Sequence, residues 1–576
     1  MCVVESATTF NMAGSVVTFL KSVWAIRSIV FIFIAFLAPI GFLFNGSLES
    51  RCAYVMVSMA ILWLTEALPI TATAMMPMFL LPLLTVQPGK VVCGNYFNDT
   101  SMLFLGGLLI GVAMEEVNIH RRIAMGITMK LGSRSNTLMF GLMLPTWVLS
   151  MWISNTAATA MMLPILTAVS EQTAAHMSLK ENQRLSKGLT LSVAYAANVG
   201  GIATLTGTPP NLVLHGQAEK QFQKVGAADS GITYANWMAF AFPLSLIMLF
   251  LTWFWLQIVF LRCGCCKSVD EGRKNAIESA VRQEYKKLGA IRFGEVVVLV
   301  LLSILALLWV FRDLPDVGGW GNGFLDADGK STVRDSTAAI LVATLLFVLP
   351  SEVPKIFCWS RYSVADVQTE EEEQNRPAYK PILTWKVAEK KVAWGVLVLL
   401  GGGFALGDAC TSSGLSRLVG CELGVLRSLD PWVMNLILCL TVAGATEITS
   451  NTATASLLMP IVFELAITTG IHPLYLMIST ALACSFAFML PVATPPNAIV
   501  FSTGYLTIPD MALSGCVMNV LAVMVLTAAI NTWGAAIFDL GSLPAIFVNS
   551  TMLSSCPGTQ SNYLINQTFA KLTTTV

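Results

Sequence analysis

The sequence SNTAATAMMLPI at residues 154–165 returns as SNTATASLLMPI at residues 450–461, with every matching position offset by 296. Each copy places three small hydrogen-bonding side chains, Ser-Asn-Thr, inside strongly apolar sequence. A polar group in such surroundings needs a partner, because leaving it unpaired costs free energy. We therefore expect a bound ligand to be the partner of both triplets.

The similarity extends beyond the triplets in both directions. At the same offset, the glycines of LFLGGLLIG (103–111) match those of LGGGFALG (400–407). GTPPN (207–211), which follows the first triplet, matches ATPPN (493–497), which follows the second, at an offset of 286. The chain is therefore composed of two related halves.

The composition indicates a membrane protein. Of the 576 residues, 55% are hydrophobic and 12% are charged, a balance too apolar for a soluble enzyme of this length. The formal net charge is zero, which excludes the basic balance expected of a nucleic-acid-binding protein. We expect a multispanning protein whose surroundings are the lipid bilayer.

Apolar runs of about 20 residues are typical of transmembrane helices. We predict an all-α fold with about eleven spans, at 28–44, 53–68, 70–86, 101–118, 190–215, 236–261, 294–311, 336–350, 393–411, 475–506 and 513–537. Two further apolar stretches, 136–169 and 432–466, carry the triplets near their middle. A continuous helix would bury the triplet at no benefit, so each stretch is predicted to be a re-entrant hairpin with Ser-Asn-Thr at its tip.

Basic residues predict the orientation. Lysine and arginine gather in the loops 262–292 and 351–392, whereas the alternate loops are poor in them: 45–52, 87–100 and 216–235. Because short cytoplasmic loops are enriched in these residues, the N-terminus is predicted to be cytoplasmic and the C-terminus extracellular. The glycosylation sequons at Asn549 and Asn566 agree, since both fall in the tail that this topology places outside.

The two halves are predicted to be inverted repeats. Five predicted spans separate the hairpins, and an odd number makes the second half enter the membrane from the opposite face. Transporters with broken helices meeting near the midplane have this architecture. We expect a cytoplasmic N-terminus at 1–27, first-half scaffold helices at 28–118 and a first-half transport unit at 119–217. The second half is expected to have scaffold helices at 236–350, a cytoplasmic loop at 351–392, a transport unit at 393–537 and an extracellular tail at 538–576.

The hairpin tips suit a cation and an anion together. They offer hydroxyls and carboxamides, but neither hairpin contains a lysine or arginine. The second arm of each hairpin begins at the tip, where unpaired N–H groups favour an anion. Backbone carbonyls freed at the Pro-Pro breaks after Thr208 and Thr494, together with neutral side-chain oxygens, can surround sodium. Each bound ion then favours the other in a low-dielectric site, so coupled symport is expected.

Ionisable residues give no sign of catalysis. No HExxH or GxSxG motif lies in a predicted span, so an enzyme is not indicated. Glu447 neighbours the second tip, where it either tunes sodium binding or orients the hairpin. An anion channel and an exchanger not driven by sodium share the composition and stay open as alternatives.

Several motifs together resemble the divalent-anion:sodium symporter family, in particular its animal sodium-coupled dicarboxylate and citrate carriers. The resemblance covers roughly residues 20–540, and its motifs are SMWISNTA (150–157), GGIATLTGTPPNL (200–212), LLGGGFAL (399–406), TEITSNTAT (446–454) and SFAFMLPVATPPNAIVF (485–501). It implies a homodimer of scaffold and transport domains that works as an elevator in the plasma membrane. Sodium ions would drive the uptake of succinate, citrate or related small carboxylate anions.

The resemblance also implies roles for individual residues. One sodium would lie near Ser150, Asn155 and Gly207, and the other near Thr446, Thr449, Asn451 and Ala493. Substrate carboxylates would meet Ser154, Asn155, Thr156, Thr208, Pro209, Ser450, Asn451, Thr452, Thr494 and Pro495.

One departure from the family pattern bears on specificity. Animal carriers of this type usually have Ala or Gly where this chain has Pro209. The residue borders the substrate, so the choice between dicarboxylate and citrate stays open. A sulfate carrier is the alternative within the family.

Overall fold

The computed structural model describes residues 27–548, apart from 132–134, 175–177, 228, 262–278, 280–281, 284, 314–317, 328–330, 353–378 and 423–427. The described secondary structure is helical and contains no strand; two isolated bridges pair Leu325 with Ser331 and Pro350 with Pro381. The predicted glycosylation sites, Asn549 and Asn566, lie outside the described residues.

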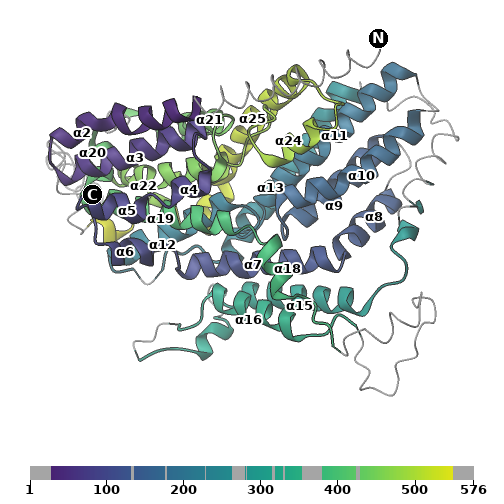
Figure 1. Ribbon diagram of the computed structural model, residues 1–576, viewed down its shortest axis with the longest axis horizontal. Helices are drawn as coiled ribbons and strands as arrows, with labels where there is room; N and C mark the ends of the chain where they lie inside the picture. The colour runs from purple at the N-terminus through teal and green to yellow at the C-terminus, as the bar shows by residue number, and fades with distance from the viewer. Residues whose placement is uncertain are drawn as a thin grey trace, which may run out of the picture.

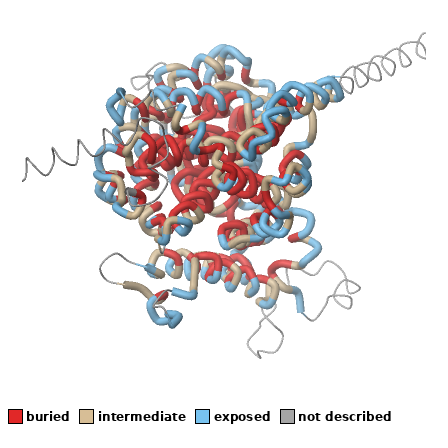
Figure 2. The backbone as a smooth tube through the Cα atoms, turned by 90° about the vertical axis from the view of Figure 1, so that its left-hand side faces the viewer, coloured by how far each residue is buried: buried red, intermediate tan, exposed pale blue. Residues whose placement is uncertain are grey.

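Eight of the described helices are long and apolar enough to cross a membrane: Arg27–Phe44, Leu48–Thr65, Gly89–Glu116, Tyr234–Leu261, Phe293–Val310, Trp394–Ser413, Asn451–Thr469 and Ile508–Ile537. Seven of them overlap predicted spans, and Asn451–Thr469 is an arm of the second predicted hairpin. Several of them carry exposed apolar side chains, such as Phe254 and Leu307. Buried residues lie at the centre of the molecule and exposed residues around it (Figure 2). The protein thus has the helices of a multi-pass membrane protein.

Both stretches predicted to form hairpins consist of two helices joined by a short turn. In the first half, α9 (Ser135–Ser150) is followed by α10 (Asn155–Ala174). In the second half, α21 (Pro431–Thr446) is followed by α22 (Asn451–Thr469). Each Ser-Asn-Thr triplet therefore lies where the turn ends and the second helix begins.

The predicted span 190–215 is not a continuous helix. Seven residues, 202–208, separate the end of α11 (Leu179–Gly201) from the start of α12 (Pro209–Lys224). Proline has no N–H and fixes its own φ, so Pro209 and Pro210 are favoured in the first turn of a helix and disfavoured in its interior. The Pro-Pro motif predicted a break, and the structure corrects its extent, because the backbone is also non-helical upstream of Thr208.

Two other predicted spans need the same correction. The stretch 475–506 contains α23 (Pro473–Ala483) and α24 (Pro495–Phe501), separated by irregular backbone. The stretch 70–86 is divided into α4 (Ile70–Ala74) and α5 (Pro77–Leu83), because Pro77 begins a new helix.

The short helices that begin with Pro-Pro pack across the boundary between the halves. Within the first half, α11 packs on α9 and α10 (Figure 1). Within the second half, α23 packs on α21 and α22. By contrast, α24 of the second half contacts α10 and α11, whereas α12 of the first half contacts α22 and α23. Each hairpin therefore meets the Pro-Pro helix of the other half, which brings both sets of motifs to one place.

The remaining helices surround this centre. The longer ones are α3 (Leu48–Thr65), α7 (Asp99–Glu116), α13 (Tyr234–Leu256), α15 (Phe293–Val310), α16 (Asp335–Val348), α19 (Trp394–Ser413) and α25 (Ile508–Ala529). Two amphipathic helices were not predicted, α8 (Ile119–Leu131) and α20 (Leu415–Glu422). They begin at positions offset by 296, as the triplets do, so they belong to the repeat.

Candidate functional site

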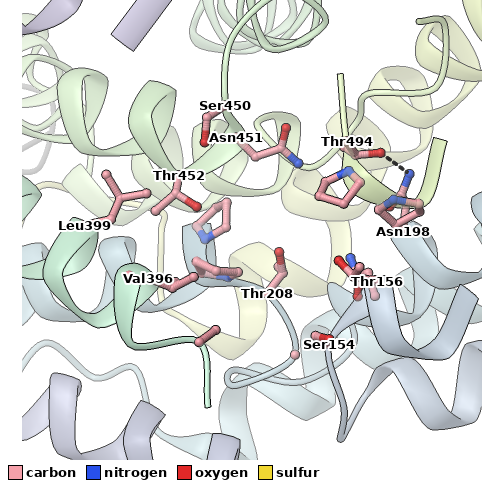
Figure 3. Close-up of a pocket in the computed structure, with 18 of the residues that line it drawn as sticks. Ser154, Thr156, Asn198, Thr208, Val396, Leu399, Ser450, Asn451, Thr452 and Thr494 are labelled. Atoms are coloured by element: carbon pink, nitrogen blue, oxygen red, sulfur yellow. Dashed lines mark hydrogen bonds between the residues drawn. The ribbon is translucent and has the colours of Figure 1, made fainter. Parts of the chain in front are cut away.

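The two hairpin tips border one cavity of about 900 Å³, shown in Figure 3. Its lining combines both Ser-Asn-Thr triplets with the Thr-Pro pairs that open α12 and α24. All the residues predicted to meet substrate line it: Ser154, Asn155, Thr156, Thr208, Pro209, Ser450, Asn451, Thr452, Thr494 and Pro495. The fold thus gathers them into a single site.

Most residues predicted to hold sodium line the same cavity, namely Asn155, Gly207, Thr449, Asn451 and Ala493. The other two, Ser150 and Thr446, are fully buried. Each of these two hydroxyls is hydrogen-bonded to the asparagine of its own tip. They lie behind the cavity lining and contact it through those asparagines.

The first tip contains a compact cluster of oxygen atoms. Ser150 Oγ lies 2.5 Å from Asn155 Oδ1 and 2.7 Å from the carbonyl oxygen of Ala197 on α11. The close approach of α11 depends on Gly201, where a Cβ atom would lie 2.5 Å from Asn155 Oδ1. The glycine therefore lets the end of α11 lie directly against the tip.

The second tip contains the equivalent cluster. Thr446 Oγ1 lies 2.8 Å from Asn451 Oδ1 and 2.8 Å from the carbonyl oxygen of Cys484. Nearby, the hydroxyls of Thr449 and Thr454 lie 2.5 Å apart. The same hydrogen-bond pattern thus occurs in both halves.

In each cluster one hydroxyl hydrogen faces two oxygen atoms, the asparagine Oδ1 and a backbone carbonyl oxygen. With the carboxamide in this orientation only one of the two contacts contains a hydrogen, because amide carbonyl oxygens are acceptors only. The opposite orientation would place Nδ2 beside the hydroxyl and give both contacts a hydrogen. A bound cation favours the first orientation, because sodium binds neutral hydroxyl and carbonyl oxygens.

The cavity also has features that suit an anion. α10 and α22 begin at the tips, where their first N–H groups have no backbone carbonyl one turn earlier and give these ends partial positive charge. In the first tip the Ser154 hydroxyl accepts one of them, the Ala157 N–H, whereas Ser450 makes no such cap. Thr208 and Thr494 each precede two prolines, and neither hydroxyl caps its helix. The two prolines supply no N–H to such a hydroxyl, so each threonine keeps its hydrogen for another acceptor, although Thr494 Oγ1 itself accepts a hydrogen bond from Asn198.

Some lining residues were missed in the sequence. Glu66, Glu115 and Lys391 also border the cavity, and Lys391 is the one lysine or arginine among the described residues that do so. Lys391 Nζ lies 2.8 Å from Glu116 Oε2. These residues come from a loop and from helix ends, where hydropathy gives no signal. Asn198 also lines the cavity and was not predicted, although a polar residue within the apolar sequence that forms the end of α11 was a usable signal.

Glu447 has a structural setting. Its carboxylate accepts hydrogen bonds from the backbone N–H groups of Phe488, Met489 and Leu490 at 2.8–3.1 Å. Asn519 Nδ2 on α25 donates a further bond at 2.7 Å. Of the two roles open for this residue, the contacts favour orientation, because it ties the end of the second hairpin's first arm to the irregular segment before α24.

Comparison with known proteins identifies the family. Residues 20–540 match the family model described as the sodium:sulfate symporter transmembrane region. The chain belongs to this symporter family. It is 41% identical to the Na(+)/citrate cotransporter of Mus musculus over 88% of this chain and 94% of that protein. It is 37% identical to the Na(+)/dicarboxylate cotransporter 3 of Homo sapiens over 91% of this chain and 94% of that protein.

A solved structure shares the fold of this symporter. The Neisseria gonorrhoeae protein MtrF, from a class of antimetabolite efflux pumps, aligns with a TM-score of 0.50 at 15% sequence identity, covering 77% of this chain and 84% of that chain. As a member of a sodium symporter family, the protein is a transporter rather than an enzyme, and sodium is its co-transported ion.

Proposed function

We propose that the protein is a sodium-coupled symporter that imports di- and tricarboxylate anions, such as succinate and citrate. The observation that carries this proposal is the pair of matching oxygen clusters at Asn155 and Asn451, which border one cavity beside two helix N-termini. Relatives that are named for cotransport of citrate and dicarboxylates with sodium support the substrate class.

Two sodium ions occupy the two tips in this proposal. One is held by Ser150, Asn155 and the backbone around Gly207, and the other by Thr446, Thr449, Asn451 and Ala493. These groups are neutral oxygens, so each ion brings a full positive charge to the edge of the cavity.

The carboxylate groups of the substrate lie between these ions. They accept hydrogen bonds from the triplets and from the hydroxyls of Thr208 and Thr494. The two sodium charges balance a dianion where the protein supplies little formal charge, so binding of the ions favours binding of the substrate, and the converse holds. This mutual dependence is the physical basis of coupling.

Transport proceeds by alternating access. The units 119–217 and 393–537 move together as an elevator against the scaffold helices in 28–118 and 236–350. The cross-packing of α12 on α22 and of α24 on α10 supports joint movement, because each half holds part of the other. The functional form is a homodimer in the plasma membrane, with the N-terminus cytoplasmic and the C-terminus extracellular.

Radiolabelled succinate uptake by cells expressing the protein tests this function. The assay compares sodium with choline medium and adds excess unlabelled citrate or sulfate as competitor. We expect uptake to require sodium and to be inhibited by citrate but not by sulfate. Uptake that does not depend on sodium would contradict the two proposed sodium sites. Inhibition by sulfate alone would assign the protein to sulfate transport.

A further inference from the structure

One hydrogen bond links the two halves directly at the cavity wall. Asn198 Nδ2 on α11 donates to Thr494 Oγ1 at 3.4 Å (Figure 3). Both residues are more than nine-tenths buried, and both line the cavity. The contact exists because α24 of the second half packs against α11 of the first.

The position of Asn198 is fixed on both sides by backbone contacts. The carbonyl oxygen of Ala197 accepts the Ser150 hydroxyl at 2.7 Å, and that of Val199 accepts the Ser245 hydroxyl at 2.6 Å. A carboxamide on a backbone held in this way loses little additional freedom when it bonds to Thr494. It is therefore suited to orient that hydroxyl.

The bond determines what Thr494 can do. A hydroxyl that accepts a hydrogen bond keeps its own hydrogen for another acceptor. Capping is not a competing use, because Pro495 and Pro496 follow directly and the hydroxyl makes no cap bond. With the Asn198 amide donating, the hydrogen of Thr494 is free to point at an oxygen in the cavity.

The second half lacks an equivalent of this arrangement. The Ser150 hydroxyl donates to the carbonyl oxygen of Ala197, and its counterpart Thr446 donates to that of Cys484. Cys484 therefore matches Ala197, and the next residue, Ser485, matches Asn198. The side chain of serine is shorter, and within the described chain the buried Ser485 hydroxyl has no hydrogen-bond partner. Thr208, the counterpart of Thr494, is thus not oriented by a carboxamide in the same way.

We propose that Asn198 is a positioning residue for substrate, which holds Thr494 as a hydrogen-bond donor to a carboxylate oxygen in the cavity. The inference rests on the proposed carboxylate transport. It makes recognition asymmetric: the carboxylate beside Thr494 meets a preset donor, and the one beside Thr208 meets a hydroxyl free to rotate. Asn198 acts on substrate affinity through Thr494.

A double-mutant cycle in cells tests the proposal, with succinate KM and maximal uptake per surface transporter measured at saturating sodium. Asn198→Ala and Thr494→Val should each raise KM about three- to tenfold, as expected for one hydrogen bond, with maximal uptake within about twofold of wild type. The double variant should have the KM of a single variant. Independent multiplication of the two effects, or a loss of maximal uptake with unchanged KM, would overturn the proposal.

Two further variants separate positioning from packing. Asn198→Asp keeps the shape but accepts the Thr494 hydrogen and adds a negative charge, so it should raise KM more than Asn198→Ala does. Wild-type KM in this variant would contradict the proposal. Ser485→Ala, at the matching position, should keep wild-type KM, and an increase equal to that of Asn198→Ala would remove the asserted asymmetry. Absence of sodium-dependent succinate uptake in the wild type would refute the proposed function instead.

Discussion

The carboxamides of Asn155 and Asn451 each lie between a buried hydroxyl and the cavity. Replacing either with Ala removes an oxygen that we assign to both sodium and substrate. A hydrogen bond to a charged group contributes about 1.5–3 kcal/mol, so uptake should fall at least about tenfold while the amount at the cell surface stays normal. Sodium-dependent succinate uptake with surface biotinylation measures both. Asn236→Ala, away from the cavity lining, is the control, and normal uptake by either tip variant would contradict the assignment.

Pro209 is the residue for which we expect an effect on specificity. Its ring borders the cavity beside Thr208, and as the first residue of α12 it offers no N–H. Pro209→Gly adds both space and one N–H donor at a helix N-terminus, which favours a larger and more highly charged anion. The preference for citrate over succinate should therefore rise about three- to tenfold, by the scale of single-group discrimination in a pocket. Competitive uptake measures the ratio, and an unchanged ratio would detach Pro209 from selectivity.

At the scale of elements, the irregular segment before α24 depends on Glu447. One carboxylate satisfies three backbone N–H groups that have no helical partners, together with Asn519. In Glu447→Gln one oxygen becomes an NH₂ group facing those donors. Since a buried donor left unsatisfied costs about 1–3 kcal/mol, the melting temperature of the purified protein should fall.

The control for Glu447 is Glu116→Gln. Glu116 pairs with Lys391 on a partly exposed surface, where an ion pair contributes about 0–1 kcal/mol. The melting temperature of the Glu116→Gln variant should stay close to that of the wild type. Equal melting temperatures for the two variants would show that the segment does not depend on the carboxylate of Glu447.

At the scale of the whole molecule, a charged cluster joins α12 of the first half to α19 of the second. Asp408 Oδ1 lies 2.9 Å from Lys224 Nζ, and Oδ2 accepts hydrogen bonds from Gln87 and Asn95. Asp408→Ala leaves the lysine and both amides without this acceptor. Because the Lys224 side chain keeps 34% exposure, we expect a loss of about 1–2 kcal/mol rather than the larger cost of breaking a fully buried pair.

Thermal unfolding in detergent measures the loss at Asp408. Asp313→Ala, a change at an exposed carboxylate, should leave the melting temperature unchanged. If both variants unfold at the wild-type temperature, the cluster does not hold the halves together.

The sequence by itself determined the paired elements and the residue types of the site. The repeated triplets, the apolar runs and the Pro-Pro motifs act locally, through hydropathy and backbone geometry, so the two hairpins and the starts of α12 and α24 could be predicted. The membrane class followed from composition for the same reason. Within the predicted spans 190–215 and 475–506 the Pro-Pro motifs predicted a break but not its length. Hydropathy does not register unwound backbone whose N–H groups are bonded elsewhere, as Glu447 bonds those before α24.

Tertiary structure decided which of these local features meet. Only the cross-packing of α12 and α24 on the opposite hairpins brings both triplets to one cavity and places Asn198 against Thr494. Likewise, the carbonyls of Ala197 and Cys484 became partners of Ser150 and Thr446 through the approach of separate helices. Contacts between residues so distant in the chain depend on the packing of whole helices, and no local pattern in the sequence encodes them.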